Sequence, residues 1–320
     1  FGFWEKDTYV LIRTQSRIDF ATVNKMTLIA LETKISNWKS ILNSARNKRI
    51  KPNLDDKILT SWNALMIQGY IDAYRALGDK EYLDIALKNA NFLVDHQLRK
   101  DQGLNRNFKN GLSTINGYSE DYATVIQSFI SLYEVTLDEK WLATAKSLID
   151  VLFVNFFDKN NKMFYFTSKE DESLIARKYE VIDGVIASSN SIIANNLFKL
   201  GHYFSDTKYL KTSEQMLNNL KEDVHMNPGN YSNWLNLMTN FTNPFYEVVV
   251  AGNNAMEVNR SLINNYNPNI LIAGTIKDNN TLPLLSYKYN EDETLIYVCV
   301  NGTCKLPQTN IKKAIESIEK

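Results

Sequence analysis

The sequence has few cysteines, no long apolar run and no excess charge of either sign. Two cysteines, Cys299 and Cys304, in 320 residues cannot build a disulfide framework, which favours a reducing compartment, and we expect a cytoplasmic protein. A membrane-spanning helix needs about 18 consecutive apolar residues, and because the chain has no such run we expect no membrane partner. Lys plus Arg (36) equals Asp plus Glu (36), which argues against nucleic acid as a partner.

An initiating methionine and a signal peptide are also absent. The chain opens with Phe1, and no basic segment followed by an apolar one stands near it. We therefore expect a piece of a longer protein. Aromatic residues make up 12% of the chain, which suits a carbohydrate-binding cleft but is also ordinary for a helical core, and composition alone favours the core.

A repeat organises the chain. Three segments that begin at Asp79, Asp138 and Asp206 share the pattern Asp-x-x-aromatic-Leu-x-x-small. The aspartate is expected to cap a helix whose first turn buries the aromatic residue and the leucine, with the small residue where another helix crosses closely. Another apolar helix precedes each copy, so the unit is a helical hairpin, and the stacked hairpins describe an α/α toroid.

The three hairpins have equivalent positions near the start of their first helices. Seventeen residues before each repeat aspartate lie Trp62, Asp121 and Ser189. If the hairpins stack around an axis, these helix starts converge on one face.

The remaining elements divide the chain into two parts. A strand over 9–13, an amphipathic helix from about 23 to 49, and turn-rich segments at 103–108 and 160–166 are predicted in the helical part. After an apolar helix over 231–241 the pattern changes to strand, helix, strand, strand and helix, predicted at 247–252, 255–264, 270–274, 294–300 and 311–318. The first two of these strands are expected to be parallel. We place a boundary near 244, with a toroid portion over 1–244 and a small α/β appendage over 245–320.

The converging helix starts carry side chains suited to carbohydrate chemistry. Glycoside hydrolysis needs one carboxylic acid to protonate the leaving oxygen and one carboxylate to attack or to activate water. The candidate catalytic residues are Asp55, Asp56, Glu120, Asp121 and Asp183. The candidate substrate-binding residues are Trp62, Asn63, Tyr118, Tyr122, Ser189 and Asn190. The alternative is that these acidic residues are helix caps, which is common at helix starts.

Four motifs resemble those of one family. They are residues 55–67 (DDKILTSWNALMI), 120–123 (EDYA), 188–191 (SSNS) and 299–304 (CVNGTC) with Pro307. Together they are similar to the YyaL-like proteins, whose animal members are called spermatogenesis-associated thioredoxin-domain proteins. The resemblance implies a six-hairpin, glycosidase-like α/α toroid, related in fold to sugar 2-epimerases and several glycoside hydrolases. Ala187 stands where the family pattern has proline.

The resemblance also implies parts that this chain does not contain. Family members carry a thioredoxin-like domain and further toroid hairpins before the point where this chain starts. A partial ring would expose inner helix faces. We therefore expect as a partner either a second copy of the chain, forming a homodimer, or the missing N-terminal half.

The two cysteines are predicted to face each other across a β-hairpin. Asn301-Gly302 is typical of a two-residue hairpin turn, which places Cys299 opposite Cys304 at a spacing that suits a disulfide. Because the resemblance implies a thioredoxin-like domain elsewhere, we hypothesise a redox pair; the alternative is two isolated core thiols. Two cysteines without a neighbouring histidine do not make a zinc site, and no metal or other cofactor is expected.

The function that we expect is carbohydrate binding or turnover, with glycoside hydrolysis as the leading reaction. One alternative is a non-catalytic scaffold or redox-linked partner domain. A second alternative, a sugar epimerase, would use a pair of histidines to move a proton next to a carbonyl. None of the three histidines, His96, His202 and His225, lies in a converging motif, which counts against the epimerase.

Overall fold

The computed structural model describes residues 2–5, 8–172, 175–278 and 281–318, and the chain divides into two compact units, Phe1–Asp56 and Lys57–Lys320. The first unit holds the antiparallel strands β1 (Gly2–Glu5) and β2 (Thr8–Val10) and the helices α1 (Arg17–Val23) and α2 (Leu28–Asn47). The boundary that we expect near residue 244 stays a prediction.

The long helix predicted from about residue 23 begins later than expected. Lys25 has a positive φ of 51°, which interrupts helical geometry between α1 and α2. The Thr27 side chain then accepts a hydrogen bond from the Ala30 amide and caps the new helix. The predicted start was wrong because a threonine cap was read as helix interior.

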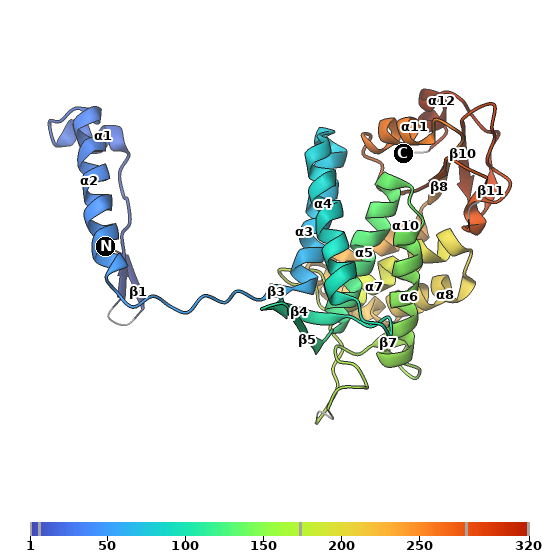
Figure 1. The fold of residues 1–320 in the computed structure, drawn as a ribbon, viewed down its shortest axis with the longest axis horizontal. Helices are drawn as coiled ribbons and strands as arrows, with labels where there is room; N and C mark the ends of the chain where they lie inside the picture. The colour runs from blue at the N-terminus through green and yellow to red at the C-terminus, as the bar shows by residue number, and fades with distance from the viewer. Residues whose placement is uncertain (1, 6–7, 173–174, 279–280, 319–320) are drawn as a thin grey trace. The chain divides into compact units, whose positions relative to one another are not determined.

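The second unit is built on three helical hairpins. They are α3 (Thr60–Leu77) with α4 (Lys80–Phe92), α5 (Ser119–Thr136) with α6 (Lys140–Asn155), and α7 (Ser189–Phe204) with α8 (Thr207–Asn219). The first helices of the hairpins pack against each other in the order α3, α5, α7, and form an inner row beside the second helices (Figure 1). After α9 (Lys221–Met226), the helix α10 (Ser232–Thr242) packs on α7 in the place of a fourth inner helix.

Asp79 and Asp206 are the helix caps that the sequence predicts, whereas Asp138 lies one residue before Glu139, the N-cap of α6. Asp79 and Asp206 accept hydrogen bonds from amides in the first turns of α4 and α8, and Asp138 accepts one from the Lys140 amide at the start of α6. The small residues of the pattern, Ala86, Ala145 and Ser213, are fully buried. Gly201 of α7 shows why close crossings select small residues, since an added Cβ would lie 2.6 Å from the Leu210 side chain of α8.

Short strands connect the hairpins. The π-helical turn η1 (Leu93–Gln97) ends the first hairpin, and β3 (Ile58–Leu59), β4 (Asn105–Lys109) and β5 (Leu112–Asn116) form an antiparallel sheet. The strands β6 (Phe157–Asp158) and β7 (Met163–Phe164) form a second small hairpin. Both turn-rich segments of the sequence therefore lie in small β-hairpins.

A four-stranded sheet follows α10, in the order β11-β10-β8-β9. Its strands are β8 (Tyr246–Ala251), β9 (Ile270–Thr275), β10 (Leu295–Val300) and β11 (Thr303–Cys304). The helices α11 (Ala255–Ile263) and α12 (Ile311–Glu316) and the 3-10 turn η3 (Pro283–Leu285) pack beside it, whereas the 3-10 turn η2 (Pro228–Asn230) lies between α9 and α10. β8 and β9 are parallel, as predicted, and β9 packs on α5.

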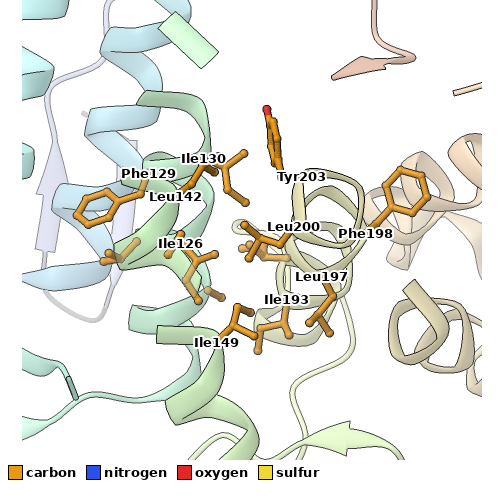
Figure 2. Packing of buried hydrophobic residues seen from close by; sticks show 14 of the residues in the cluster. Ile126, Phe129, Ile130, Leu142, Ile149, Ile193, Leu197, Phe198, Leu200 and Tyr203 are labelled. Carbon is orange, nitrogen blue, oxygen red and sulfur yellow. The ribbon is translucent and has the colours of Figure 1, made fainter. Parts of the chain in front are cut away.

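The main core lies between the inner helices and their partners. Figure 2 shows side chains of α5, α6 and α7 meeting there, among them Ile126, Ile149, Ile193, Leu197 and Leu200. All five are fully buried. Tyr203 also joins the helices to the sheet, because its hydroxyl donates to the Ile272 carbonyl oxygen of β9 at 2.7 Å.

The domain is mainly helical and has the architecture of a partial α/α toroid with an α/β appendage. The described residues contain three complete hairpins, and large apolar side chains of α3 stay exposed, namely Trp62, Met66 and Leu77. None of the helices in the described ranges has the length and apolarity that crossing a membrane requires.

Core packing yields a matched pair of variants. Leu197→Ala removes a fully buried side chain and should lower the free energy of unfolding by about 2–5 kcal/mol, because a cavity remains. Leu77→Ala, whose side chain is 68% exposed, should change it by no more than about 0.5 kcal/mol. Urea unfolding followed by circular dichroism measures both, and equal losses would contradict this description of the core.

Candidate functional site

The starts of the inner helices meet through direct hydrogen bonds. The Ser61 amide of α3 donates to Asp121 Oδ1 of α5 at 3.0 Å. Ser119 Oγ of α5 donates to Ser189 Oγ of α7 at 3.0 Å. Asn233 at the start of α10 donates through Nδ2 to Ser191 Oγ of α7 at 2.9 Å. These bonds confirm that the helix starts converge.

Asp121 is the most constrained of the predicted carboxylates. It is fully buried, and its Oδ2 accepts bonds from the Tyr118 amide at 2.9 Å and from Arg106 Nη1 at 3.1 Å. Burial raises its pKa from 3.8 to about 6, against the opposing effects of Arg106 and of the two amides that it accepts from. The Glu120 carboxylate raises the pKa further. Asp121 therefore titrates at a higher pH than an ordinary aspartate, and it has no exposed surface with which to reach a substrate.

Glu120 is the accessible neighbour of Asp121. Its side chain is 17% exposed, and its Oε2 lies 3.8 Å from the same Arg106 Nη1. The Arg106 guanidinium also lies over the Tyr118 ring, 4.6 Å from the centroid, a cation–π geometry. Glu120, Arg106 and Tyr118 thus form one contiguous polar and aromatic group in front of the buried Asp121.

Asp183 lies at the same end of the molecule in a capping role. Its Oδ1 accepts hydrogen bonds from the Ser188 amide at 2.9 Å and from Ser191 Oγ at 2.8 Å, and its Oδ2 accepts one from the Asn233 amide at 2.8 Å. One buried carboxylate thus caps both α7 and α10. This matches the helix-cap alternative that the sequence left open.

Three predicted binding residues lie inside the fold. Asn190 is buried and pairs with both backbone groups of Phe164, which attaches β7 to α7. The Tyr122 ring is buried, and its hydroxyl accepts a bond from the Leu104 amide at 2.9 Å. Ser189 is buried in its contact with Ser119. These side chains hold the helix starts together and present no free face to a ligand.

Trp62 and Asn63 differ from each other although they are adjacent. The Trp62 indole is 62% exposed at the start of α3. Asn63 is half-buried, and its Nδ2 donates to the Leu59 carbonyl oxygen at 2.8 Å, so it stabilises the first turn of its own helix. Trp62 is the residue of this pair that is free to contact a sugar ring.

Asp55 and Asp56 are exposed residues at the end of the first unit. The site described here is built from residues of the second unit alone. The catalytic assignment of Asp55 and Asp56 stays a prediction.

Two accessible residues were missed from the sequence. Arg106 lies on β4, in a segment read only as a turn-rich hairpin. Glu180 lies in the segment before α7, and its Oε2 accepts the Ser189 amide at 3.0 Å while the residue stays exposed. The sequence could have indicated Arg106 as a site residue because it is the one charged residue of the segment 103–108. Glu180 stands outside the repeat register and gave no such signal. We call Trp62, Arg106, Tyr118, Glu120 and Glu180 the helix-start surface.

The opposite ends of the inner helices meet at a second buried carboxylate. Glu134 near the end of α5 forms ion pairs with Arg75 of α3 and Lys199 of α7. These cations lower its pKa even though burial alone would raise it. The three side chains line a cavity of about 460 Å³.

Histidines and metal ligands are not gathered at the helix starts. His202 lies in the last turn of α7, where its Nδ1 contacts Glu247 Oε1 at 2.8 Å, and it is therefore a satisfied structural histidine. His96 packs against the Phe92 and Phe108 rings, which also contact each other. Within the described ranges, no group of three or more His, Cys, Asp or Glu residues has the arrangement needed to hold a metal ion.

The raised pKa of Asp121 predicts a pH-dependent stability. The folded protein binds the Asp121 proton more tightly than the unfolded chain does. The contribution of this proton to the free energy of unfolding is therefore fully present below pH 3.8 and is lost as the pH rises through about 6. The loss should amount to about 3 kcal/mol in wild type, at roughly 1.4 kcal/mol per pKa unit. In Asp121→Asn this part of the pH dependence should vanish.

Urea unfolding at several pH values between 4 and 7 measures the difference, with Asp84→Asn, an exposed aspartate of α4, as the control. Identical pH profiles for wild type and Asp121→Asn would show that Asp121 titrates alike in the folded and unfolded states, contrary to this prediction.

The helical region is similar to a known family of proteins. Residues 37–245 match the family model described as beta-L-arabinofuranosidase, GH127 catalytic domain. Spermatogenesis-associated protein 20 of Homo sapiens is 27% identical over 88% of this chain and 38% of its own length. The uncharacterized protein B0495.5 of Caenorhabditis elegans is 30% identical over 70% of this chain and 31% of its own length. The chain thus spans less than half the length of these relatives.

A solved GH76 α-mannanase of Bacteroides thetaiotaomicron superimposes with a TM-score of 0.44 and 20% identity, covering 54% of this chain and 47% of the mannanase. The family match spans all three hairpins, and the relatives include spermatogenesis-associated protein 20. The chain therefore belongs to the family of the beta-L-arabinofuranosidase GH127 catalytic domain, in the group of YyaL-like and spermatogenesis-associated proteins.

Proposed function

We propose that this domain binds a carbohydrate at the helix-start surface and hydrolyses a glycosidic bond there. The observation that carries the proposal is the contact between Ser119 and Ser189, which joins α5 and α7 with an accessible carboxylate on either side. Glu120 directly follows Ser119, and Glu180 accepts the Ser189 amide. The match to a glycosidase family supports the same class of reaction.

Glu120 and Glu180 are the carboxylates that we assign to the chemistry. Hydrolysis requires one carboxylic acid to protonate the leaving oxygen and one carboxylate to act on the anomeric carbon or on the attacking water. Asp183 is committed to two helix caps, so its oxygens are already occupied by protein donors. Glu120 and Glu180 each keep exposed surface.

Asp121 is assigned a positioning role behind Glu120. It orients Arg106 through a 3.1 Å contact and holds the first turn of α5 through the Tyr118 amide. Arg106 in turn lies against the Tyr118 ring and within ion-pair distance of Glu120. Loss of Asp121 would therefore displace Arg106 and Glu120 together.

Trp62 provides the surface for sugar stacking. Its exposed indole follows Ser61, whose amide bonds to Asp121, so Trp62 belongs to the helix start that contacts the start of α5. A large aromatic face packs against the C–H face of a sugar while carboxylates and a guanidinium bind hydroxyl groups. Because the family description names a β-L-arabinofuranosidase, a β-L-arabinofuranoside is the first substrate to test.

The two alternative functions have less support. A two-histidine epimerase would need histidines at this surface, whereas His202 lies at the other end of α7 in contact with Glu247. A non-catalytic scaffold would leave Glu120 and Glu180 without a chemical task, and the experiment below separates it from the hydrolase.

Hydrolysis of a panel of p-nitrophenyl glycosides that includes the β-L-arabinofuranoside tests the proposal. Glu120→Gln and Glu180→Gln should each lower kcat by about 10²-fold or more, because general acid–base groups contribute on that scale. Glu222→Gln, an exposed glutamate of α9, is the matched control and should keep wild-type activity. Trp62→Ala should raise KM more than it lowers kcat.

Circular dichroism verifies that each variant is folded. If wild type hydrolyses none of the panel and no sugar raises its Tm, the scaffold function is favoured. Activity that survives both Glu120→Gln and Glu180→Gln would reject these two residues as the catalytic pair.

A further inference from the structure

The hairpin formed by β10 and β11 carries a disulfide between directly opposed residues. Cys299 pairs with Cys304 and Val300 with Thr303, as the Asn301-Gly302 turn predicts, and Cys299 and Cys304 are disulfide-bonded. Asn301 and Gly302 have φ values of 50° and 77°, the left-handed pair that a two-residue hairpin turn requires. The predicted register is confirmed.

The two sulfur-bearing residues differ in their access to solvent. Cys299 is buried, with 1% of its surface exposed, because it lies in the strand that pairs with β8. Cys304 is exposed, as are its neighbours Thr303 and Lys305. Leu306, two residues further along the chain, is 83% exposed. A thiolate can therefore approach the disulfide from one side only.

The hairpin can open without disturbing the rest of the sheet. β11 is an edge strand of two residues that pairs only with β10, whereas β10 pairs with β8 over five residues from Leu295 to Cys299. Other bonds at the turn are those of the Gly302 amide to Glu247 Oε2 at 3.1 Å and of the Lys305 amide to the Val298 carbonyl oxygen at 2.9 Å. Cleavage of the disulfide would loosen the hairpin at 299–304, whereas the pairing of β10 with β8 and the backbone hydrogen bonds between Ile296 and Gln308 would keep the core strand in place.

We propose that Cys299 and Cys304 form a thiol–disulfide exchange site whose reaction partner is a protein dithiol. A thiolate of the partner attacks Cys304 Sγ, and a mixed disulfide forms while Cys299 leaves as a thiolate and takes a proton. The second thiol of the partner then attacks the partner's first sulfur, which is bonded to Cys304 in the mixed disulfide. Cys304 is released as a thiolate and is protonated. Two electrons pass from the partner to this chain, and the partner leaves as a disulfide.

The turn is connected to the helical part of the molecule through Glu247. Its Oε2 accepts the Gly302 amide, and its Oε1 contacts His202 Nδ1 in the last turn of α7. Glu247 is almost fully buried. When the hairpin opens, this carboxylate loses one of its donors, so the redox state of the pair acts on a contact that reaches α7.

Reduction of the native protein by dithiothreitol, with thiols trapped by iodoacetamide and counted by intact mass, tests the exchange site. We expect two alkylated thiols to appear at a rate within about 100-fold of the rate in urea-unfolded protein, because the attacked sulfur is exposed. A larger slowing would mean that reduction waits for global unfolding, which occurs in about one molecule in 10³ or fewer. That result would overturn the proposal.

Two single variants test which sulfur is attacked. Cys299→Ser leaves the exposed Cys304 thiol, and Cys304→Ser leaves the buried Cys299 thiol. With oxidised glutathione as the probe, Cys299→Ser should form the mixed disulfide at least about 10-fold faster than Cys304→Ser. Equal rates, or a faster reaction of Cys304→Ser, would overturn the proposal. Neither variant touches Glu120 or Glu180, so this result is independent of the hydrolase test.

Discussion

The arrangement of the helix starts depends on one buried carboxylate. Asp121 accepts hydrogen bonds from the amides of Ser61 and Tyr118 and pairs with Arg106. A buried carboxylate is costly unless donors compensate it, and here the donors come from α3, from the residue before α5 and from β4. One side chain thereby positions three elements, and Glu134 ties the same inner helices together at their other ends. The helix α5 is the centre of the domain because it carries a buried carboxylate at each end.

The polar residues at the helix starts fall into a buried group, which holds the structure together, and an accessible group. Asp121, Asp183, Ser189 and Asn190 are buried and bonded to backbone groups or to each other, so their polar atoms hold the helix starts in place. What remains toward solvent is the helix-start surface, with two carboxylates, a guanidinium and an exposed indole. The proposed function therefore uses Trp62 and Glu120 of the motifs together with Arg106 and Glu180 outside them, and the buried motif residues form the support.

Much of the architecture could be predicted from the sequence because it depends on local patterns. The repeat at Asp79, Asp138 and Asp206 indicated the hairpins, since a capping aspartate and a buried small residue recur at fixed spacing. The Asn301-Gly302 turn determined the register of Cys299 and Cys304, since a two-residue hairpin has only one pairing. The convergence of the helix starts followed from counting within the repeat.

The site itself was less predictable because its contacts are non-local. The pairing of Asp121 with Arg106 joins α5 to β4, and nothing in the segment around Arg106 indicates that it reaches a buried carboxylate. Whether a residue such as Tyr122 or Asn190 faces solvent or core depends on which loop covers it, and sequence alone did not show that Phe164 and Leu104 would occupy their polar atoms. Glu180 lies outside the repeat register and was found only through its bond to Ser189.

The junction of α3, β4 and α5 is built on Asp121 as a buried carboxyl group whose pKa is raised by burial. The most direct measurement is an NMR titration of its side-chain carboxyl carbon between pH 3 and 8 in the folded protein. We expect a midpoint near 6. A midpoint near the ordinary value of 3.8 would contradict this, because the effect of burial on the pKa would then not exceed the opposing effects of Arg106 and of the Ser61 and Tyr118 amides.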